Sequence, residues 1–299
     1  MLRRFRLEEP ETVKEASDLL SQYGESARVY AGGTELLLAM KEGLLRYERL
    51  VNIKRIPGLN GAKLENGEVH IGALSTHRQL ECSSLLRERL PAFVQMERNV
   101  ANLRVREVGT LGGNLTFAEP HADPGTLLMV LGARLVAQKA SSAREIPTEE
   151  FFVDAYEVCL EEDEVLTEIR VPLLPARCGV RYLKFGHLER PSVGVALLLV
   201  WDEVGRSIEN ARLAVGCLGP KSRRIEEAEE VLKGKDFKEA SKLIGKAGEI
   251  AGRASDAISD LHGSADYKEH IVQVLLKRAF NQIYEQTVSE RKGGEKSHA

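Results

Sequence analysis

The chain has 299 residues, of which 43% are hydrophobic and 29% are charged, and its formal net charge at pH 7 is -3. This composition is typical of a soluble protein long enough for two domains, and the small net charge gives no general attraction to nucleic acid or an anionic membrane. The longest apolar run, VGVALLLVW, is half a membrane span, and no apolar segment follows the basic N-terminus. We therefore expect no membrane span and a cytoplasmic location.

The cysteines and histidines show no metal-binding pattern. The four cysteines lack C-x-x-C spacing, and the seven histidines form no His-Glu-x-x-His or comparable motif. We therefore predict neither a zinc site nor an iron-sulfur site in this chain. No nucleophile is evident either, so we predict no catalytic residue.

The N-terminal part of the chain alternates predicted helices and strands. Apolar spacing indicates a helix that starts after Thr12 and stops at Gly24, and ARVYA is typical of a strand. The segment AGGT, a helical run at 35–41 and a strand at 49–53 follow. This order places the glycine pair at the carboxyl end of a strand, where ligands usually bind.

The rest of the chain gives a longer series of predicted elements. Up to a boundary at Pro172 to Pro175 they are a strand at 68–75, helices at 76–80, 90–100 and 124–131, and strands at 133–138 and 164–172. Beyond the boundary, three closely spaced strands suit an antiparallel meander, at 180–186, 192–201 and 208–219. Helices at 225–232, 237–253 and 267–285 close the chain before a polar tail.

Two glycine segments, AGGT at 31–34 and TLGGN at 110–114, suggest a ligand. A Gly-Gly turn offers backbone N–H groups that no Cβ obstructs, and such groups can bind phosphate oxygens. Taken alone, either segment is also typical of an ordinary turn. Two in one domain match the two phosphoryl groups of a pyrophosphate, and Asp123 is near enough in sequence to accept from ribose hydroxyls. The pattern indicates a dinucleotide, although it is neither the Rossmann G-x-G-x-x-G nor a Walker loop.

These segments carry a family resemblance. AGGTELL, VGTLGGNL, AEPHADPGTLLMVLGA and VLTEIRVP have the order and spacing of the FAD-binding medium subunit of the xanthine dehydrogenase and carbon monoxide dehydrogenase family. LAVGCLGPKSRRIEEAEEVLKGK resembles the start of that subunit's C-terminal domain. The resemblance implies an α+β fold with a vanillyl-alcohol-oxidase/PCMH-like FAD-binding domain of two subdomains and a C-terminal domain of three antiparallel strands and a helical bundle. The implied bounds are 1–174 (subdomains about 1–56 and 57–174), 175–288, and a disordered polar tail at 289–299.

The resemblance also implies which residues bind FAD. The residues that would surround the pyrophosphate are Ala31, Gly32, Gly33, Thr34 and Glu35 on one side, and Thr110, Gly112, Gly113 and Asn114 on the other. Asp123 would bind ribose or ribityl hydroxyls, Leu166 would pack near the isoalloxazine, and Lys184 would lie near its pyrimidine edge, where a cation raises the flavin potential. Each of these three side chains also has an alternative role without a cofactor. Leu166 can be a core residue of its strand, Lys184 a solvated lysine, and Asp123 only the cap of the next helix.

One local departure concerns the residues before the second glycine segment. They are Arg106 and Glu107, where relatives often have Arg-Asn, so contacts there can differ. The chain also lacks the cysteine-bearing insertion with which 4-hydroxybenzoyl-CoA reductases hold an additional cluster. The cluster-bearing form of that branch is therefore disfavoured.

Members of this family work beside a large subunit with the molybdenum cofactor and a small subunit with two [2Fe-2S] clusters, commonly as a dimer of heterotrimers. The resemblance therefore implies an oxidoreductase subunit through whose FAD electrons pass from those clusters to an external acceptor. One alternative is a stand-alone flavin-dependent oxidoreductase, which would need a larger substrate-binding domain. Another is an assembly subunit that has lost its flavin. Co-purification separates these three hypotheses. The electron-transfer subunit should bring iron and molybdenum partners with it, the stand-alone oxidoreductase should carry flavin without metals, and the assembly subunit should carry neither.

Overall fold

The computed structural model describes residues 2–186 and 190–296. The chain divides into two compact units, of which the first combines Met1–Glu119 with Gly132–Leu173 and the second combines Pro120–Leu131 with Leu174–Ala299. Both units mix helices and sheets, as predicted for an α+β fold. Within the residues that the structure describes, no helix is long and apolar enough to cross a membrane.

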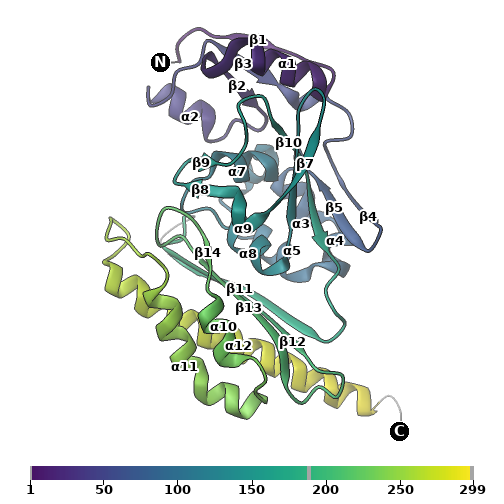
Figure 1. The fold of residues 1–299 in the computed structure, drawn as a ribbon, viewed down its shortest axis with the longest axis vertical. Coiled ribbons are helices and arrows are strands. Elements are labelled where there is room, and N and C mark those ends of the chain that lie inside the picture. The colour runs from purple at the N-terminus through teal and green to yellow at the C-terminus, as the bar shows by residue number, and fades with distance from the viewer. Residues whose placement is uncertain (1, 187–189, 297–299) are drawn as a thin grey trace. The chain divides into compact units, whose positions relative to one another are not determined.

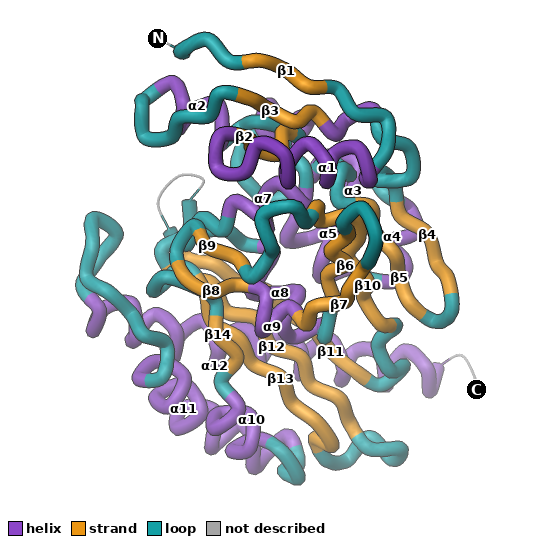
Figure 2. Tube along the Cα trace, turned by 45° about the horizontal axis from the view of Figure 1, so that its top comes forward, coloured by secondary structure: helices purple, strands orange, loops and turns teal. Residues whose placement is uncertain are grey.

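The first unit begins with a parallel three-stranded sheet in the order β1 (Arg6–Glu8), β3 (Arg49–Asn52) and β2 (Ala27–Tyr30) (Figures 1 and 2). Two helices cover it, α1 (Val13–Tyr23) and α2 (Leu36–Lys41). Val51 of β3 packs in a core with α1, whereas its neighbour Leu50 packs in a core with α2, because successive strand residues point to opposite faces. The glycine pair follows the carboxyl end of β2, as predicted.

The second sheet of this unit is antiparallel and has five strands in the order β4 (Ala62–Glu65), β5 (Glu68–Gly72), β10 (Val165–Pro172), β6 (Arg134–Gln138) and β7 (Ala143–Pro147). A β-bulge interrupts β10, because Leu166 pairs with Ala137 whereas Glu168 pairs with Val136. Thr167 is therefore an extra residue directly after Leu166. Bulges often lie beside binding sites, where they redirect the neighbouring side chain.

Short elements complete the first unit. They are α3 (His77–Cys82), α4 (Ser84–Arg89), α5 (Pro91–Glu97), α6 (Leu103–Val108), α7 (Leu111–Phe117), α9 (Thr148–Phe151), β8 (Phe152–Asp154) and β9 (Glu157–Val158), with 3-10 turns at Gly24–Ser26 and Ile53–Arg55. Of these, α4, α6, α7, α9, β8 and β9 were not predicted from the sequence. Segments this short hold too few residues to show a hydrophobic period.

The second unit is built on an antiparallel meander of β11 (Cys178–Phe185), β12 (Val193–Trp201) and β13 (Ile208–Gly216), to which β14 (Arg223–Arg224) adds a two-residue edge. Figure 1 shows three helices beside this sheet, α10 (Glu226–Leu232), α11 (Phe237–Arg253) and α12 (Ala265–Lys296). Their apolar faces and one face of the sheet form a single core, with Leu197, Leu213 and Phe280 fully buried or nearly so. The predicted strands and helices are confirmed here.

Residues 120–131 belong to the second unit, although the sequence analysis assigned them to the first domain. The helix in this segment, α8 (Pro124–Leu131), packs on β12 and β13, and all of its residues are buried. A helix that is apolar on every side needs burial on every side. The packing partners of α8, which a local pattern does not reveal, therefore decide its domain.

The C-terminal helix α12 continues to Lys296. Residues 289–296, which we expected to be part of a disordered tail, are thus helical, whereas 297–299 lie outside the described residues. Glutamate, arginine and lysine in this stretch have good helix propensity, and the helix before it provides the nucleus.

Truncation of the second unit's core gives a direct test of the packing. Leu197→Ala removes a fully buried side chain, and we expect it to lower the free energy of unfolding by about 2–5 kcal/mol. Trp201, the only tryptophan of the chain, lies 5.0 Å from the Phe237 ring, so its fluorescence in urea follows this unit. Val204→Ala, at a position 69% exposed, is the control and should change stability by less than about 0.5 kcal/mol. Equal effects of the two variants would contradict the assigned core.

Candidate functional site

The first unit contains a pocket of about 350 Å³. Small-molecule sites usually measure roughly 300–1,000 Å³, so this pocket holds only part of a large cofactor. Its wall includes ten of the twelve residues that sequence analysis proposed for binding, which are Ala31, Gly32, Gly33, Thr34, Glu35, Thr110, Gly112, Gly113, Asn114 and Leu166. Three segments far apart in the sequence therefore meet at one pocket.

The first glycine segment requires its two glycines for different steric reasons. A Cβ on Gly32 would lie 2.3 Å from the carbonyl oxygen of Val108, in the chain that leads into the second segment. A Cβ on Gly33 would lie 2.4 Å from Cε2 of Tyr30, and Gly33 has a φ of +74°, which L side chains rarely adopt. The absence of a β-carbon on Gly32 therefore allows the two glycine segments to touch, whereas its absence on Gly33 makes room for Tyr30 and permits the positive φ.

The backbone donors of the first segment are available to a ligand. Within the described chain, the N–H groups of Gly32, Gly33 and Thr34 form no hydrogen bond, and all three residues lie in the pocket wall. Unpaired N–H groups are costly where no water or ligand satisfies them. Three neighbouring donors fit an acceptor-rich group such as a phosphate.

The second glycine segment is not the turn that sequence analysis expected. Thr110 caps helix α7, and the two glycines stand in the first turn of that helix. The backbone N–H groups of this segment already donate hydrogen bonds within the chain. The Leu111 N–H donates to Ser75 O and the Gly112 N–H to Ala73 O, while the N–H groups of Gly113 and Asn114 donate to Oγ1 and O of Thr110. These N–H groups cannot serve a phosphate without breaking the cap or the contact with residues 73–75, which follow β5.

Close packing explains the glycines of the second segment instead. A Cβ on Gly112 would lie 2.6 Å from the Cβ of Ala73, and one on Gly113 would lie 2.8 Å from Thr110 Oγ1. The segment offers a side chain to the pocket, because Asn114 Oδ1 is buried there and has no hydrogen-bond partner. A buried acceptor of this kind is satisfied by a hydroxyl or amine of a ligand. Together the two segments provide donors for an anion and an acceptor for a hydroxyl, which fits a dinucleotide.

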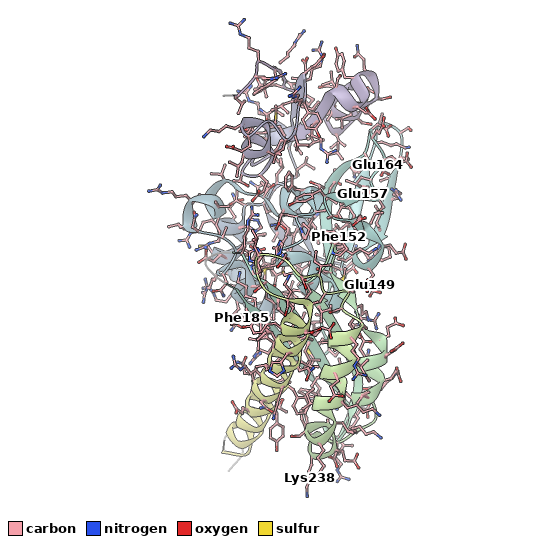
Figure 3. All side chains as sticks on the ribbon, turned by 90° about the vertical axis from the view of Figure 1, so that its left-hand side faces the viewer. Glu149, Phe152, Glu157, Glu164, Phe185 and Lys238 are labelled. Atoms are coloured by element: carbon pink, nitrogen blue, oxygen red, sulfur yellow. The ribbon has the colours of Figure 1, made fainter. Side chains whose placement is uncertain are left out.

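The loop 155–164 forms another wall of the pocket, and contacts at both ends hold it. At its start the Tyr156 N–H donates to Ala118 O over 2.8 Å. At its end Arg144 donates to both carboxylate oxygens of Glu164 over 2.7 and 2.8 Å. Glu157 and Glu164, both labelled in Figure 3, make this wall acidic. The Arg144 guanidinium lowers the pKa of Glu164, whose side chain is only 3% exposed, so that carboxyl stays ionised.

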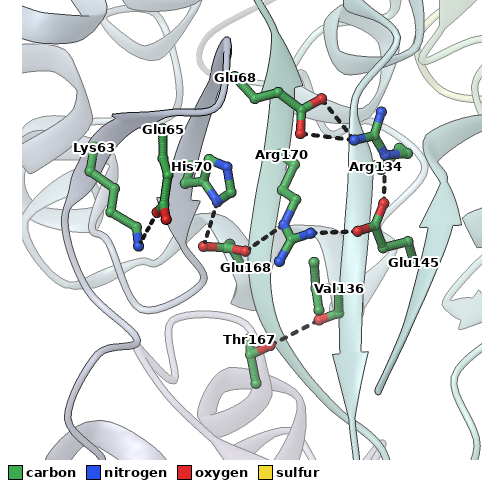
Figure 4. Close-up of polar contacts among 10 residues, drawn as sticks. All are labelled: Lys63, Glu65, Glu68, His70, Arg134, Val136, Glu145, Thr167, Glu168 and Arg170. Atoms are coloured by element: carbon green, nitrogen blue, oxygen red, sulfur yellow. Dashed lines mark hydrogen bonds and ion pairs between the residues drawn. The ribbon is translucent and has the colours of Figure 1, made fainter. Parts of the chain in front are cut away.

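A network of ion pairs joins the strands that flank β10 (Figure 4). Arg134 of β6 binds Glu68 of β5 over 2.7 Å and Glu145 of β7 over 2.6 Å. Arg170 of β10 contacts Glu145 and binds Glu168 over 2.7 Å. The network reaches across four strands and holds β10, with its bulge after Leu166, in one register.

The two remaining predicted residues lie in the second unit and pair with each other. Lys184 Nζ donates to Asp123 Oδ2 over 2.9 Å, and the Tyr182 hydroxyl donates to Asp123 Oδ1 over 2.7 Å. Burial raises the pKa of Tyr182 well above its usual range, so its hydroxyl remains a donor. Tyr182 was not among the predicted residues, although it stands two residues before Lys184 on β11 and therefore shares its face.

A further pocket residue, His77, also escaped the sequence analysis. It lies in the pocket wall at the first position of α3, and its Nδ1 is 2.7 Å from Glu97 Oε2. The sequence indicated a cap at Thr76, directly before it, but the partner Glu97 lies on another helix, α5. Among the described residues, no group of three or more His, Cys, Asp or Glu side chains could hold a metal ion.

Comparison with known proteins gives the same assignment for both parts of the chain. Residues 3–174 match the family described as the FAD binding domain in molybdopterin dehydrogenase, and residues 184–283 match the CO dehydrogenase flavoprotein C-terminal domain. The carbon monoxide dehydrogenase medium chain of Hydrogenophaga pseudoflava is 33% identical over 93% of this chain and 96% of that one. The 6-hydroxypseudooxynicotine dehydrogenase complex subunit alpha of Paenarthrobacter nicotinovorans is 30% identical over 90% of each.

A solved structure is also similar over nearly the whole length. Carbon monoxide dehydrogenase from Hydrogenophaga pseudoflava, in a form that lacks the Mo-pyranopterin moiety of the molybdenum cofactor, has a chain that matches with a TM-score of 0.91. The identity is 33%, and the match covers 95% of this chain and 99% of that chain. Sequence and structure thus agree on the relatives.

The Arg144–Glu164 pair predicts a pH-dependent stability of the first unit. The pKa of Glu164 is below its ordinary 4.5 in the folded chain, so its stabilising effect is complete above pH 4.5 and is lost as the pH falls through the lowered value. We expect Arg144→Met to lower the free energy of unfolding by about 1–3 kcal/mol at pH 7, and by much less at a pH where Glu164 is protonated.

Urea unfolding followed by far-ultraviolet circular dichroism at both pH values measures this difference. Lys139→Met is the control, because Lys139 pairs with the more exposed Glu161 on the same loop. A difference between Arg144→Met and the unaltered chain that stays constant with pH would contradict the role of Glu164.

Proposed function

We propose that this chain, which belongs to the family of FAD-binding medium subunits of xanthine dehydrogenase and carbon monoxide dehydrogenase, is the electron-transfer subunit of a molybdenum-containing dehydrogenase in the cytoplasm. Its partners are a large subunit with the molybdenum cofactor and a small subunit with two [2Fe-2S] clusters, in a dimer of heterotrimers. Electrons from those clusters reach an external acceptor through the FAD of this subunit. The substrate is oxidised in the large subunit, and we assign no catalytic residue to this chain.

The observation that carries the proposal is the meeting of the two glycine segments at Gly32. It brings the N–H donors of Gly32, Gly33 and Thr34 into the same pocket as the partnerless oxygen of Asn114. FAD carries both the pyrophosphate that would accept from those donors and the hydroxyls that would donate to Asn114. When bound, FAD supplies the redox chemistry, and the residues of the chain bind it, orient it and limit its contact with water.

Each wall of the pocket has a separate part in this proposal. The three N–H groups after β2 hold the pyrophosphate, and the side chains of Thr110 and Asn114 complete the polar contacts from α7. Leu166 supplies an apolar surface at the point where the bulge redirects β10. Carboxylates of the loop 155–164 disfavour a phosphate beside them, so we assign the pyrophosphate to the glycine-lined wall. Asp123 and Lys184 are proposed to act on the cofactor as a pair.

Substitution at Gly32 tests the binding of FAD. Gly32→Ala places a methyl group 2.3 Å from Val108 O and must separate the two glycine segments. We expect FAD affinity to fall by roughly a hundredfold, about 2.8 kcal/mol at 1.4 kcal/mol for each factor of ten. The measurement is a titration of the full chain with FAD, followed by visible absorbance and by thermal protection.

Gly245→Ala is the matched control, because Gly245 is exposed on α11 and a Cβ there meets nothing within 4 Å. It should leave FAD affinity unchanged. An unaltered affinity of a folded Gly32→Ala variant would show that the contact of the two segments does not hold the cofactor.

Purification of the chain from its own cells tests the electron-transfer role. We expect the tagged full chain to bring with it FAD, iron and molybdenum, together with one larger and one smaller partner subunit. Reduced partner clusters should then bleach the flavin absorbance in a rapid-mixing experiment under anaerobic conditions. Flavin without metals would favour a stand-alone flavin-dependent oxidoreductase, and absence of both would favour an assembly subunit.

A further inference from the structure

The pocket contains a buried histidine whose position is held from three sides. His77 is the first residue of α3 and lies within the capping box that Thr76 and Gln79 form. Its backbone N–H donates to Gly109 O over 3.0 Å, and its Nδ1 is 2.7 Å from Glu97 Oε2. His77 is 2% exposed and Glu97 is fully buried. These contacts leave the imidazole ring little freedom to turn.

The free edge of this ring faces the place where the two glycine segments meet. A Cβ built on Gly109 would lie 3.4 Å from His77 Cδ2 and 3.5 Å from Thr34 Oγ1, so these three residues converge in the pocket wall. Nε2 is bonded to Cδ2 and therefore belongs to the same edge. Within the described chain Nε2 has no hydrogen-bond partner.

The surroundings determine what the ring can offer. Nδ1 lies against a carboxylate, which only accepts, so Nδ1 carries a proton. The neighbouring backbone N–H groups of Gly32, Gly33 and Thr34 are all hydrogen-bond donors, so they fit a ligand group that is rich in acceptors. To contact that same group, Nε2 must also carry a proton. In the proposed complex the Glu97 carboxylate at Nδ1 is the group that would balance the charge of a ring that donates from both nitrogens.

We propose that His77, held and charge-balanced by Glu97, donates from Nε2 to the pyrophosphate of the bound dinucleotide. This inference rests on the proposed FAD site and adds to it the one positively charged group that we assign to the glycine-lined wall. Glu97 is a positioning residue, because it acts through His77 and does not reach the ligand. Charged donors bind phosphate more strongly than backbone amides do, so His77 contributes specificity for the pyrophosphate.

Titration of the full chain with FAD and with ADP, which carries the pyrophosphate without the flavin, tests this role. We expect His77→Gln and Glu97→Gln each to weaken both ligands at least roughly tenfold. The double variant should be no weaker than His77→Gln, because Glu97 acts only through His77. His70→Gln is the matched control, since His70 is also buried and bound to a glutamate, Glu168, but lies outside the pocket wall.

Nitrogen NMR of the unaltered chain with labelled histidine gives a second readout that a purely structural role would not change. The His77 signals, assigned by their loss in His77→Gln, should show two protonated ring nitrogens in the ADP complex. A ring with one unprotonated nitrogen, or variants that bind as tightly as the unaltered chain, would overturn the inference and leave the FAD site intact. If the unaltered chain binds neither FAD nor ADP, the proposed function fails and this inference fails with it.

Discussion

The contact between Gly32 and the Val108 carbonyl is the constraint on which the first unit depends. It brings the loop after β2 of the three-stranded sheet against the end of helix α6, at a distance that no side chain on Gly32 permits. Backbone hydrogen bonds then link α7 to the five-stranded sheet. Ala73 O accepts from the Gly112 N–H, and the Ala73 N–H donates to Thr167 O in the bulge of β10. Groups linked in this way cannot shift separately without leaving buried polar atoms unpaired. The pocket therefore depends on the packing of the β2 loop against the segment that joins α6 to α7, and neither segment provides it alone.

The parts of this structure that sequence analysis predicted are those that local patterns determine. The Thr12 side chain accepts from the Glu15 N–H at the start of α1, and Gly24 ends that helix, as the spacing indicated. The run VGVALLLVW is continuous because β12 is buried on both faces, by α8 and by the C-terminal helices. The positions of the glycine segments in the pocket followed from the family resemblance, since each segment alone is also typical of an ordinary turn.

The parts that sequence analysis missed depend on distant contacts. Two adjacent glycines are poor helix formers, yet Gly112 and Gly113 stand in the first turn of α7, because close packing on Ala73 and the Thr110 cap outweigh their propensity. The segment 120–131 has a clear helical pattern, but only its packing reveals which unit it joins. The importance of His77 comes from Glu97, twenty residues away on a different helix. Such pairings are invisible to a search for ligand spacing along the chain.

The ion pair of Asp123 and Lys184 changes what either residue can do to a cofactor. The family resemblance implied a cation beside the flavin and a separate acceptor for hydroxyls. In the second unit these charges lie 2.9 Å apart, and Tyr182 binds the other oxygen of an Asp123 that is 4% exposed. A cation with so close a counter-charge acts as a dipole, and its field falls more steeply with distance than that of a single charge. Any stabilisation of a reduced flavin by Lys184 therefore belongs to the pair, and Tyr182, which fixes the carboxylate, helps to set its strength.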